Sequence, residues 1–339
     1  MEKRESFQSR WGFILACIGS AVGMGNIWMF PTRVSLYGGG AFLIPYIIFV
    51  VLIGSTGVIG EMSFGRGTRS GPIDAFGTAC ERHGKRKIGE ALGMIPVVGS
   101  MAMAIGYTVV MGWILKYAIG AFSGTTLAPE HVDDFADKFG SMASAFGNNG
   151  WQVLILCITM AILMFGVGNG IETANKIMMP IFFFLFVGLG IYIAFQPGAA
   201  TGYHYIFRID PVALADPKTW IFALGQAFFS LSITGSGMIV YGTYLAKTED
   251  IPKASIRTAF FDTVAAMMAA LAIMPAVFAF GIEPNAGPPL MFITLPEIFR
   301  QMPMGRLFAV IFFLSVAFAG ITSLINMFEA VSESWQNRF

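Results

Sequence analysis

The chain has 339 residues, of which 55% are hydrophobic and only 12% are charged, and its mean hydropathy is +0.69. Since a soluble protein carries about 25% charged residues, this composition argues against a soluble enzyme and favours a protein whose solvent is the lipid bilayer. The formal net charge of +1 argues against a nucleic-acid partner, which would require a basic surface.

Eight long apolar segments follow one another along the chain. They lie at 12–31, 41–64, 91–122, 151–168, 174–196, 219–245, 257–282 and 305–331. Each is too long and too continuously apolar for a barrel strand, and a helix is the other structure that satisfies backbone groups in lipid. The sequence therefore predicts an all-α polytopic membrane protein with one transmembrane domain over residues 1–339.

Lysine and arginine are concentrated in three regions, at 3–10, 66–87 and 247–257. If every apolar segment crosses the membrane, these regions fall on one side and the acidic loop at 123–149 falls on the other. Because short cytoplasmic loops carry an excess of basic residues, we expect eight crossings of the inner (plasma) membrane and a cytoplasmic N-terminus.

Two of the apolar segments carry a run of small residues in the middle. Residues 19–26 read GSAVGMGN and residues 230–237 read SLSITGSG, and glycines inside a helix are costly. Close packing of helices through small residues explains either run alone. Because segments one and six stand five apart, we interpret the pair as broken helices at matching places of two inverted halves, which is typical of a transporter binding site.

Short motifs follow in a fixed order along the chain. They are GSAVGMGNIWMFP at 19–31, GGGAF at 38–42, PY at 45–46, Glu61 with GR at 65–66, GQAFFSLS at 225–232, FITLP at 292–296 and FAGITS at 318–323. Together they resemble the neurotransmitter:sodium symporter family, in its bacterial type, whose fold is the LeuT type. The resemblance implies a five-plus-five inverted repeat, with 12–196 as the first repeat and 219–331 as helices six to eight of the second. Helices nine onward are missing, so we expect a chain truncated after helix eight, with a natural eight-helix form as the alternative.

Members of that family couple sodium entry to the uptake of amino acids or their derivatives, and two sodium sites are implied. By similarity, the first takes the Ala21 carbonyl and the side chains of Asn26, Ser230 and Asp262. The second takes the carbonyls of Gly19, Val22 and Ala319 and the hydroxyls of Thr322 and Ser323. Oxygen ligands suit a hard cation, and Asp262 is a lone acid in an apolar helix. The plainer interpretations are an acid at the end of a span and hydroxyls that bond their own helix backbone.

The resemblance also implies a substrate site between helices one, three, six and eight. Its residues are Ser20, Ala21, Met24, Gly25, Met103, Tyr107, Phe229, Ser230, Ser232, Gly235, Ser323 and Met327. Tyr107 would bind the substrate carboxylate and Phe229 would close over it. Gly23 stands where amine-selective members carry Asp, which favours an amino acid over a biogenic amine. The three flexible methionines and the small Gly235 predict a pocket for a medium or large neutral amino acid.

Gate residues depart from the family pattern. Besides Tyr107 and Phe229, the implied gates are Met29 on the outside and Arg4 with Asn337 on the inside. Met29 stands where most members have Arg, and Asn337 stands where an acid usually pairs with the N-terminal arginine. A fixed carboxylate at Asp262 could replace the chloride that many animal members use, so we expect chloride independence.

Other functions stay open at this stage. A proton-coupled carrier of the same fold is one, and Glu61 could either cap broken backbone or move protons. A membrane sensor that binds its ligand without transport is another. An enzyme is not expected, because the sequence shows no nucleophile with a nearby base, no phosphate loop and no metal cluster. The expected partners are a small-molecule substrate, namely a neutral amino acid, and membrane lipid, and a homodimer is left open.

Overall fold

The computed structural model describes residues 6–233, 235–279 and 289–336, and these ranges are helical apart from short connections and one isolated bridge between Gly39 and Ile209. The elements in chain order are α1 (Arg10–Ala21), η1 (Gly25–Met29), α2 (Phe30–Leu36), α3 (Gly40–Phe49), η2 (Val50–Gly54), α4 (Ser55–Thr68), α5 (Pro72–Glu81), α6 (Arg86–Ser123), η3 (Thr125–Leu127), α7 (Val132–Ala143), α8 (Asn149–Met164), η4 (Val167–Glu172), α9 (Thr173–Ala194), α10 (Ala199–Phe207), α11 (Pro211–Ala215), α12 (Pro217–Ser230), α13 (Gly237–Thr243), α14 (Ile251–Ala279), η5 (Leu290–Thr294), α15 (Leu295–Gln301) and α16 (Gly305–Gln336).

Helices occupy all eight apolar segments that the sequence predicts. Five unbroken spans are long and apolar enough to cross a membrane, namely Gly40–Thr68, Arg86–Ser123, Val167–Ala194, Ile251–Ala279 and Gly305–Gln336. A sixth span results if α1 and Gly25–Leu36, which are bent by 51° at their break, count as one. The fourth segment forms α8, which is apolar but has only 16 residues. The sixth segment is divided into α12 and α13. Length and composition thus support a multi-pass membrane protein, with five or six of the eight expected crossings counted in the described residues.

Both predicted breaks are present. α1 ends because Val22 leaves the helix for extended backbone, with φ −74° and ψ 112°. α12 ends before a turn in which Ser232 and Ser236 have φ of +54° and +63°. Residues other than glycine rarely adopt positive φ and do so at a cost that the surrounding structure has to offset. Two strained serines in one break therefore indicate that packing against other elements holds it open.

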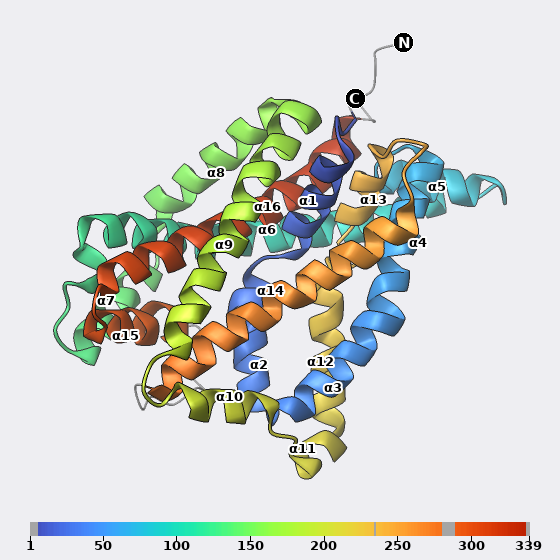
Figure 1. Ribbon diagram of the computed structural model, residues 1–339. Helices are drawn as coiled ribbons and strands as arrows, with labels where there is room; N and C mark the ends of the chain where they lie inside the picture. Colours follow the sequence, from blue (N-terminus) through green and yellow to red (C-terminus); the bar gives the residue numbers. More distant parts are fainter. Residues whose placement is uncertain (1–5, 234, 280–288, 337–339) are drawn as a thin grey trace.

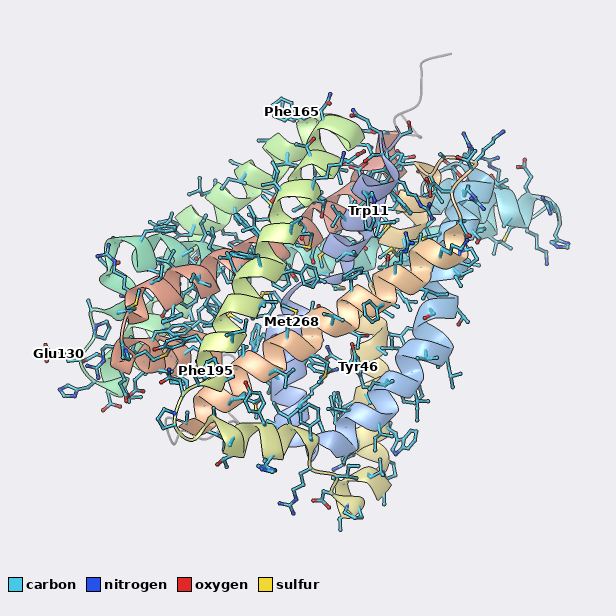
Figure 2. The ribbon with its side chains drawn as sticks, viewed as in Figure 1. Trp11, Tyr46, Glu130, Phe165, Phe195 and Met268 are labelled. Atoms are coloured by element: carbon cyan, nitrogen blue, oxygen red, sulfur yellow. The ribbon has the colours of Figure 1, made fainter. Side chains whose placement is uncertain are left out.

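The outer faces of the helices carry large apolar side chains. Phe165 beyond α8 and Phe195 beyond α9 are 69% and 83% exposed, and Figure 2 shows Phe165 at the edge of the molecule. Tyr46, by contrast, is fully buried in the interior. Apolar surface of this extent is a feature of proteins that lie in lipid.

α14 is the helix that links the two breaks. It crosses the molecule diagonally in Figure 1 and packs against α1, η1 and α2. α9 and α16 also pack on α1, and α12 contacts η1. The broken backbone of α1 is therefore enclosed by helices five to eight of the predicted numbering.

Candidate functional site

The two breaks are joined by hydrogen bonds from side chains to backbone. Ser232 Oγ donates to the Ser20 carbonyl at 3.0 Å, and Gln226 Nε2 donates to the Gly25 carbonyl at 2.8 Å. Because broken helices leave carbonyls without a helical partner, such contacts stabilise the two unwound segments against each other.

Three residues of the predicted first sodium site meet in one buried cluster. Asp262 on α14 accepts from Asn26 Nδ2 at 2.7 Å and from Ser230 Oγ at 2.8 and 2.9 Å. Asn26 Nδ2 also lies 3.0 Å from Ser230 Oγ and 3.0 Å from the Asp262 carbonyl, while Asn26 Oδ1 accepts from Gly23 N at 3.0 Å. The fourth residue, Ala21, is buried in the adjoining break of α1.

The carboxyl group of Asp262 has no exposed surface. Among the described residues, no ion pair includes it. A carboxylate away from water is costly unless a cation or a proton neutralises it. Asp262 is thus an interior group of α14, not an acid at the end of the span.

The residues of the predicted second site also come together, where α16 passes the break of α1. Ser323 Oγ lies 3.3 Å from the Gly19 carbonyl and 3.1 Å from the Val22 carbonyl. Thr322 Oγ1 instead donates to Ala319 O at 2.9 Å, inside its own helix. Thr322 therefore bonds its own helix backbone in this structure, as the plainer interpretation expects, whereas Ser323 bridges α16 to α1.

A cavity of about 960 Å³ lies beside these clusters. All twelve residues of the predicted substrate site line it: Ser20, Ala21, Met24, Gly25, Met103, Tyr107, Phe229, Ser230, Ser232, Gly235, Ser323 and Met327. They come from α1, η1, α6, α12, the turn after α12, and α16. The structure therefore brings together residues that are more than 300 positions apart in the sequence. Met103 is the most open of them, with 41% of its surface exposed.

Tyr107 and Phe229 contact the break of α1 directly. The Tyr107 hydroxyl accepts a hydrogen bond from Met24 N at 2.9 Å. A Cβ placed on Gly23 would lie 2.5 Å from both the Tyr107 and the Ser323 hydroxyls, and one placed on Gly25 would lie 2.8 Å from the Phe229 ring. Glycine at these two positions is thus required by close approach, not only by the break itself.

Several polar residues of the cavity were not predicted as site residues. Ser100 on α6 donates to the Gly235 carbonyl, and Glu61, Ser236 and Asn326 line the same cavity. Polar residues in the middle of otherwise apolar spans were the available signal for Ser100 and Asn326. No sequence signal placed Ser236 in its left-handed conformation.

The predicted gates are only partly described. Arg4 and Asn337 lie outside the described residues. Met29 is partly buried next to a shallow hollow that also includes Arg33, one helical turn further along α2. Arg33 Nη1 donates to the Phe222 carbonyl at 3.2 Å, and its guanidinium lies 5.6 Å from the centre of the Phe222 ring. A positive charge is therefore present near Met29, at a position that lies outside the motif at 19–31.

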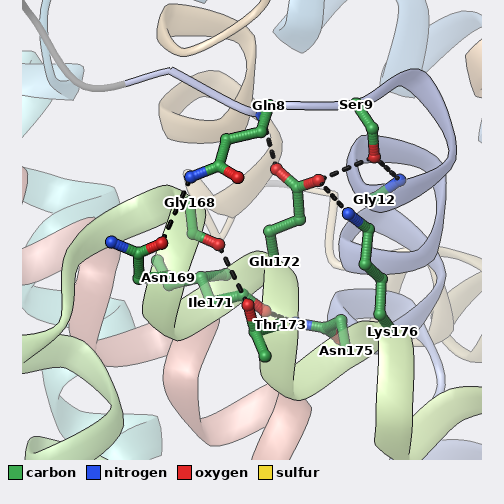
Figure 3. Close-up of polar contacts among 10 residues, drawn as sticks. All are labelled: Gln8, Ser9, Gly12, Gly168, Asn169, Ile171, Glu172, Thr173, Asn175 and Lys176. Carbon is green, nitrogen blue, oxygen red and sulfur yellow. Dashed lines mark hydrogen bonds and ion pairs between the residues drawn. The ribbon is translucent and has the colours of Figure 1, made fainter.

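A second buried acid holds the start of α1. Glu172, which is fully buried, accepts from Gln8 N at 2.5 Å and from Ser9 Oγ at 2.7 Å, and it pairs with Lys176 Nζ at 2.6 Å (Figure 3). Ser9 in turn caps α1 by accepting from Gly12 N at 3.0 Å. The i, i+4 spacing of Glu172 and Lys176 was the only sequence signal, and it does not reveal the contact with α1.

Comparisons with known proteins agree with this geometry. The model described as "Sodium:neurotransmitter symporter family" matches residues 4–135 and 130–339. The chain is 34% identical to the uncharacterized sodium-dependent transporter YhdH of Bacillus subtilis, over 97% of this chain and 72% of that protein. It is 33% identical to an uncharacterized sodium-dependent transporter of Haemophilus influenzae, over 99% of this chain and 75% of that protein.

A solved structure has a similar fold. The crystal structure of MhsT in complex with L-phenylalanine matches with a TM-score of 0.89 and 35% identity, over 99% of this chain and 76% of that chain.

Proposed function

Because the chain belongs to the sodium:neurotransmitter symporter family, a family of sodium-dependent membrane transporters and not of enzymes, we propose that it imports a medium or large neutral amino acid together with sodium. The observation that carries the proposal is the cavity in which both broken helices, Tyr107 and the neighbourhood of Asp262 meet. Sodium is a co-transported substrate in this proposal.

The first sodium site is supported by the donors around Asp262. Its carboxylate, Ser230 and Asn26 can provide oxygen atoms, and a cation there would neutralise a charge that the described residues leave buried. In the present arrangement Asn26 turns its amide nitrogen toward Asp262. Sodium binding therefore requires this amide to rotate by half a turn and to give up its bond from Gly23 N.

The second sodium site is supported by carbonyl groups at the end of α1 and by two hydroxyls of α16. Ser323 already contacts the Gly19 and Val22 carbonyls, and these are the carbonyl oxygens that a sodium ion would bind. Thr322 would have to release Ala319 O before its oxygen and that carbonyl could share a cation. An ion here would hold α1 and α16 together.

Substrate and sodium binding are coupled by charge in this proposal. An amino acid brings a carboxylate to a place that already contains Asp262, and two anions at close range in a medium of low dielectric repel each other. Sodium relieves that repulsion, so the substrate binds well only with sodium. The helix that begins at Gly25 and the Tyr107 hydroxyl would bind the substrate carboxylate.

The size of the substrate follows from the walls of the cavity. Met24, Met103 and Met327 are adaptable, and Gly235 leaves space in the same cavity, since a Cβ there would meet nothing closer than 3.5 Å. The similar structure of MhsT contains L-phenylalanine, which supports a large substrate for this chain.

A thermal-shift screen of the purified protein tests both parts of the proposal. We expect leucine-sized and aromatic amino acids to raise the unfolding temperature in sodium and to have little effect in potassium at equal ionic strength, because a ligand stabilises the protein according to its affinity. Glycine and alanine should have weaker effects. Stabilisation that is equal in potassium would favour a proton-coupled carrier, and binding without flux in proteoliposomes would favour a sensor.

Chloride independence is a further part of the proposal, since Asp262 provides a fixed negative charge beside the first sodium site. We expect the sodium-dependent uptake of the substrate into proteoliposomes to keep its rate when gluconate replaces chloride. A collapse of uptake in gluconate would contradict this role of Asp262.

The remaining expectations stay predictions. They are the location in the inner membrane with a cytoplasmic N-terminus and the five-plus-five repeat, while a homodimer stays an open alternative.

A further inference from the structure

Asn175, at the start of α9, has one amide end without a partner. It is fully buried, and its Nδ2 donates to the Ile171 carbonyl at 2.8 Å (Figure 3). Its Oδ1 has no hydrogen-bond partner within the described part of the chain. Leaving a buried carbonyl oxygen unsatisfied costs about 1–3 kcal/mol, so this oxygen is available to bind a ligand if its surroundings provide a site for one.

The unpartnered oxygen lies against the break of α1. A Cβ placed on Gly19 would overlap Asn175 Oδ1 and would lie 2.9 Å from Thr322 Cβ. Gly19 and Thr322 are two members of the second sodium site, and the absence of a side chain on Gly19 is what admits the amide. None of the five residues that the family resemblance assigns to this site comes from α9.

The same end of this span contacts α1 in two places. Glu172 and Asn175 are three residues apart and lie on one helical face. Each faces a glycine of α1, because a Cβ on Gly12 would overlap the Glu172 carboxylate just as one on Gly19 would overlap the Asn175 amide. Since Gly12 and Gly19 are seven residues apart, they also share a face. One contact holds the start of α1, and the other reaches its broken end.

We propose that Asn175 Oδ1 is an additional oxygen ligand of the second sodium site, either to the ion or to a water that the ion holds. The inference rests on the proposed function. It adds a third helix, α9, to the carbonyls of α1 and the hydroxyls of α16, so that sodium at this site binds α1 both to α16 and to α9. A cation satisfies the Asn175 oxygen, which no described protein group does.

The test is a sodium titration of thermal stability, without substrate and at saturating substrate, with potassium as the balancing ion. In the Asn175→Leu variant we expect the half-maximal sodium concentration to rise about tenfold, as for the loss of one contact to an ion. Substrate affinity at saturating sodium should stay within about twofold. Asn175→Asp keeps an oxygen at this place and should match or exceed the sodium affinity of the parent chain.

Asn148 provides a matched control. It is also buried, its Nδ2 donates to a backbone carbonyl (Val109 O, 2.7 Å), and its Oδ1 has no hydrogen-bond partner in the described residues. It does not line the cavity, and it precedes α8. Asn148→Leu should therefore leave the sodium titration unchanged, even if both leucine variants change the unfolding temperature in potassium.

The outcomes separate this inference from the proposed function. If the parent chain responds to sodium and Asn175→Leu responds at the same concentrations, the inference is wrong and the symporter proposal stands. If Asn148→Leu shifts the titration equally, the effect is a general one and the inference is again wrong. If the parent chain shows no sodium response, both are wrong. Should Asn175→Leu fail to fold, Asn175→Ala takes its place with the same expected shift.

Discussion

Replacing Asp262 by Asn should remove the part of the sodium response that comes from the first sodium site at ordinary salt concentrations. The carboxylate accepts hydrogen bonds from Asn26 and Ser230 in a site without solvent exposure. Loss of one charged partner costs about 2 kcal/mol, which corresponds to an increase of about 30-fold in the half-maximal sodium concentration. Sodium-dependent binding of the substrate should weaken with it, as measured by titration calorimetry in sodium and in potassium.

The variant protein should still be well folded. In potassium its unfolding temperature should equal or exceed that of the parent chain, because an uncompensated buried carboxylate has been removed. Asp250→Asn is the control, since Asp250 is a partly exposed acid that pairs with Lys253 at 3.0 Å and such surface pairs contribute little. A half-maximal sodium concentration that stays the same in Asp262→Asn would exclude this residue from the first sodium site.

Replacing Gly23 by Ala should reduce substrate affinity by about tenfold or more, since overpacking a close contact costs about 1–3 kcal/mol. The added methyl group would lie 2.5 Å from the hydroxyls of Tyr107 and Ser323. Tyr107 would have to move away from Met24 N, and Ser323 away from the carbonyls of α1. The substrate site and the second sodium site should both bind more weakly, so the sodium titration should shift along with substrate binding.

Gly106→Ala is the matched control for this change. Gly106 precedes Tyr107 on α6, and a Cβ there would meet no atom within 4 Å. Because alanine is better than glycine inside a helix by about 0.5–1 kcal/mol, this variant should be slightly more stable and should bind substrate as before. Equal affinity in the Gly23→Ala and parent proteins would show that the Tyr107–Ser323 contact does not shape the substrate site.

Chemical regularities of the sequence predicted most of the fold and of the candidate site. Apolar length located the eight helical segments, because the need to satisfy backbone groups in lipid leaves few alternatives. Glycines in the middle of the first and sixth apolar segments located both breaks, because these residues are costly in a continuous helix. The motifs then identified twelve residues that all line one cavity.

Several residues could not be found in that way. Arg33 lies one helical turn after Met29 and just outside the motif at 19–31, and its position beside Phe222 depends on how α2 lies against α12. Ser232 and Ser236 adopt positive φ in a local sequence that does not require it. The sequence shows Glu172 only as an i, i+4 neighbour of Lys176, and its contact with the start of α1 depends on how the helices pack.

The sequence by itself determined that this chain lies in a membrane, where its helices break and that Asp262 carries charge into the interior, since these depend on composition and on local backbone preferences. Only the tertiary structure decided which of those groups meet. Asp262 meets Asn26 across 236 residues of chain and Ser230 across 32, and Asn175 reaches Gly19 because two helices pack closely. Such contacts depend on how helices cross and, at Gly19, on the absence of a side chain. The periodicity of a single segment predicts neither.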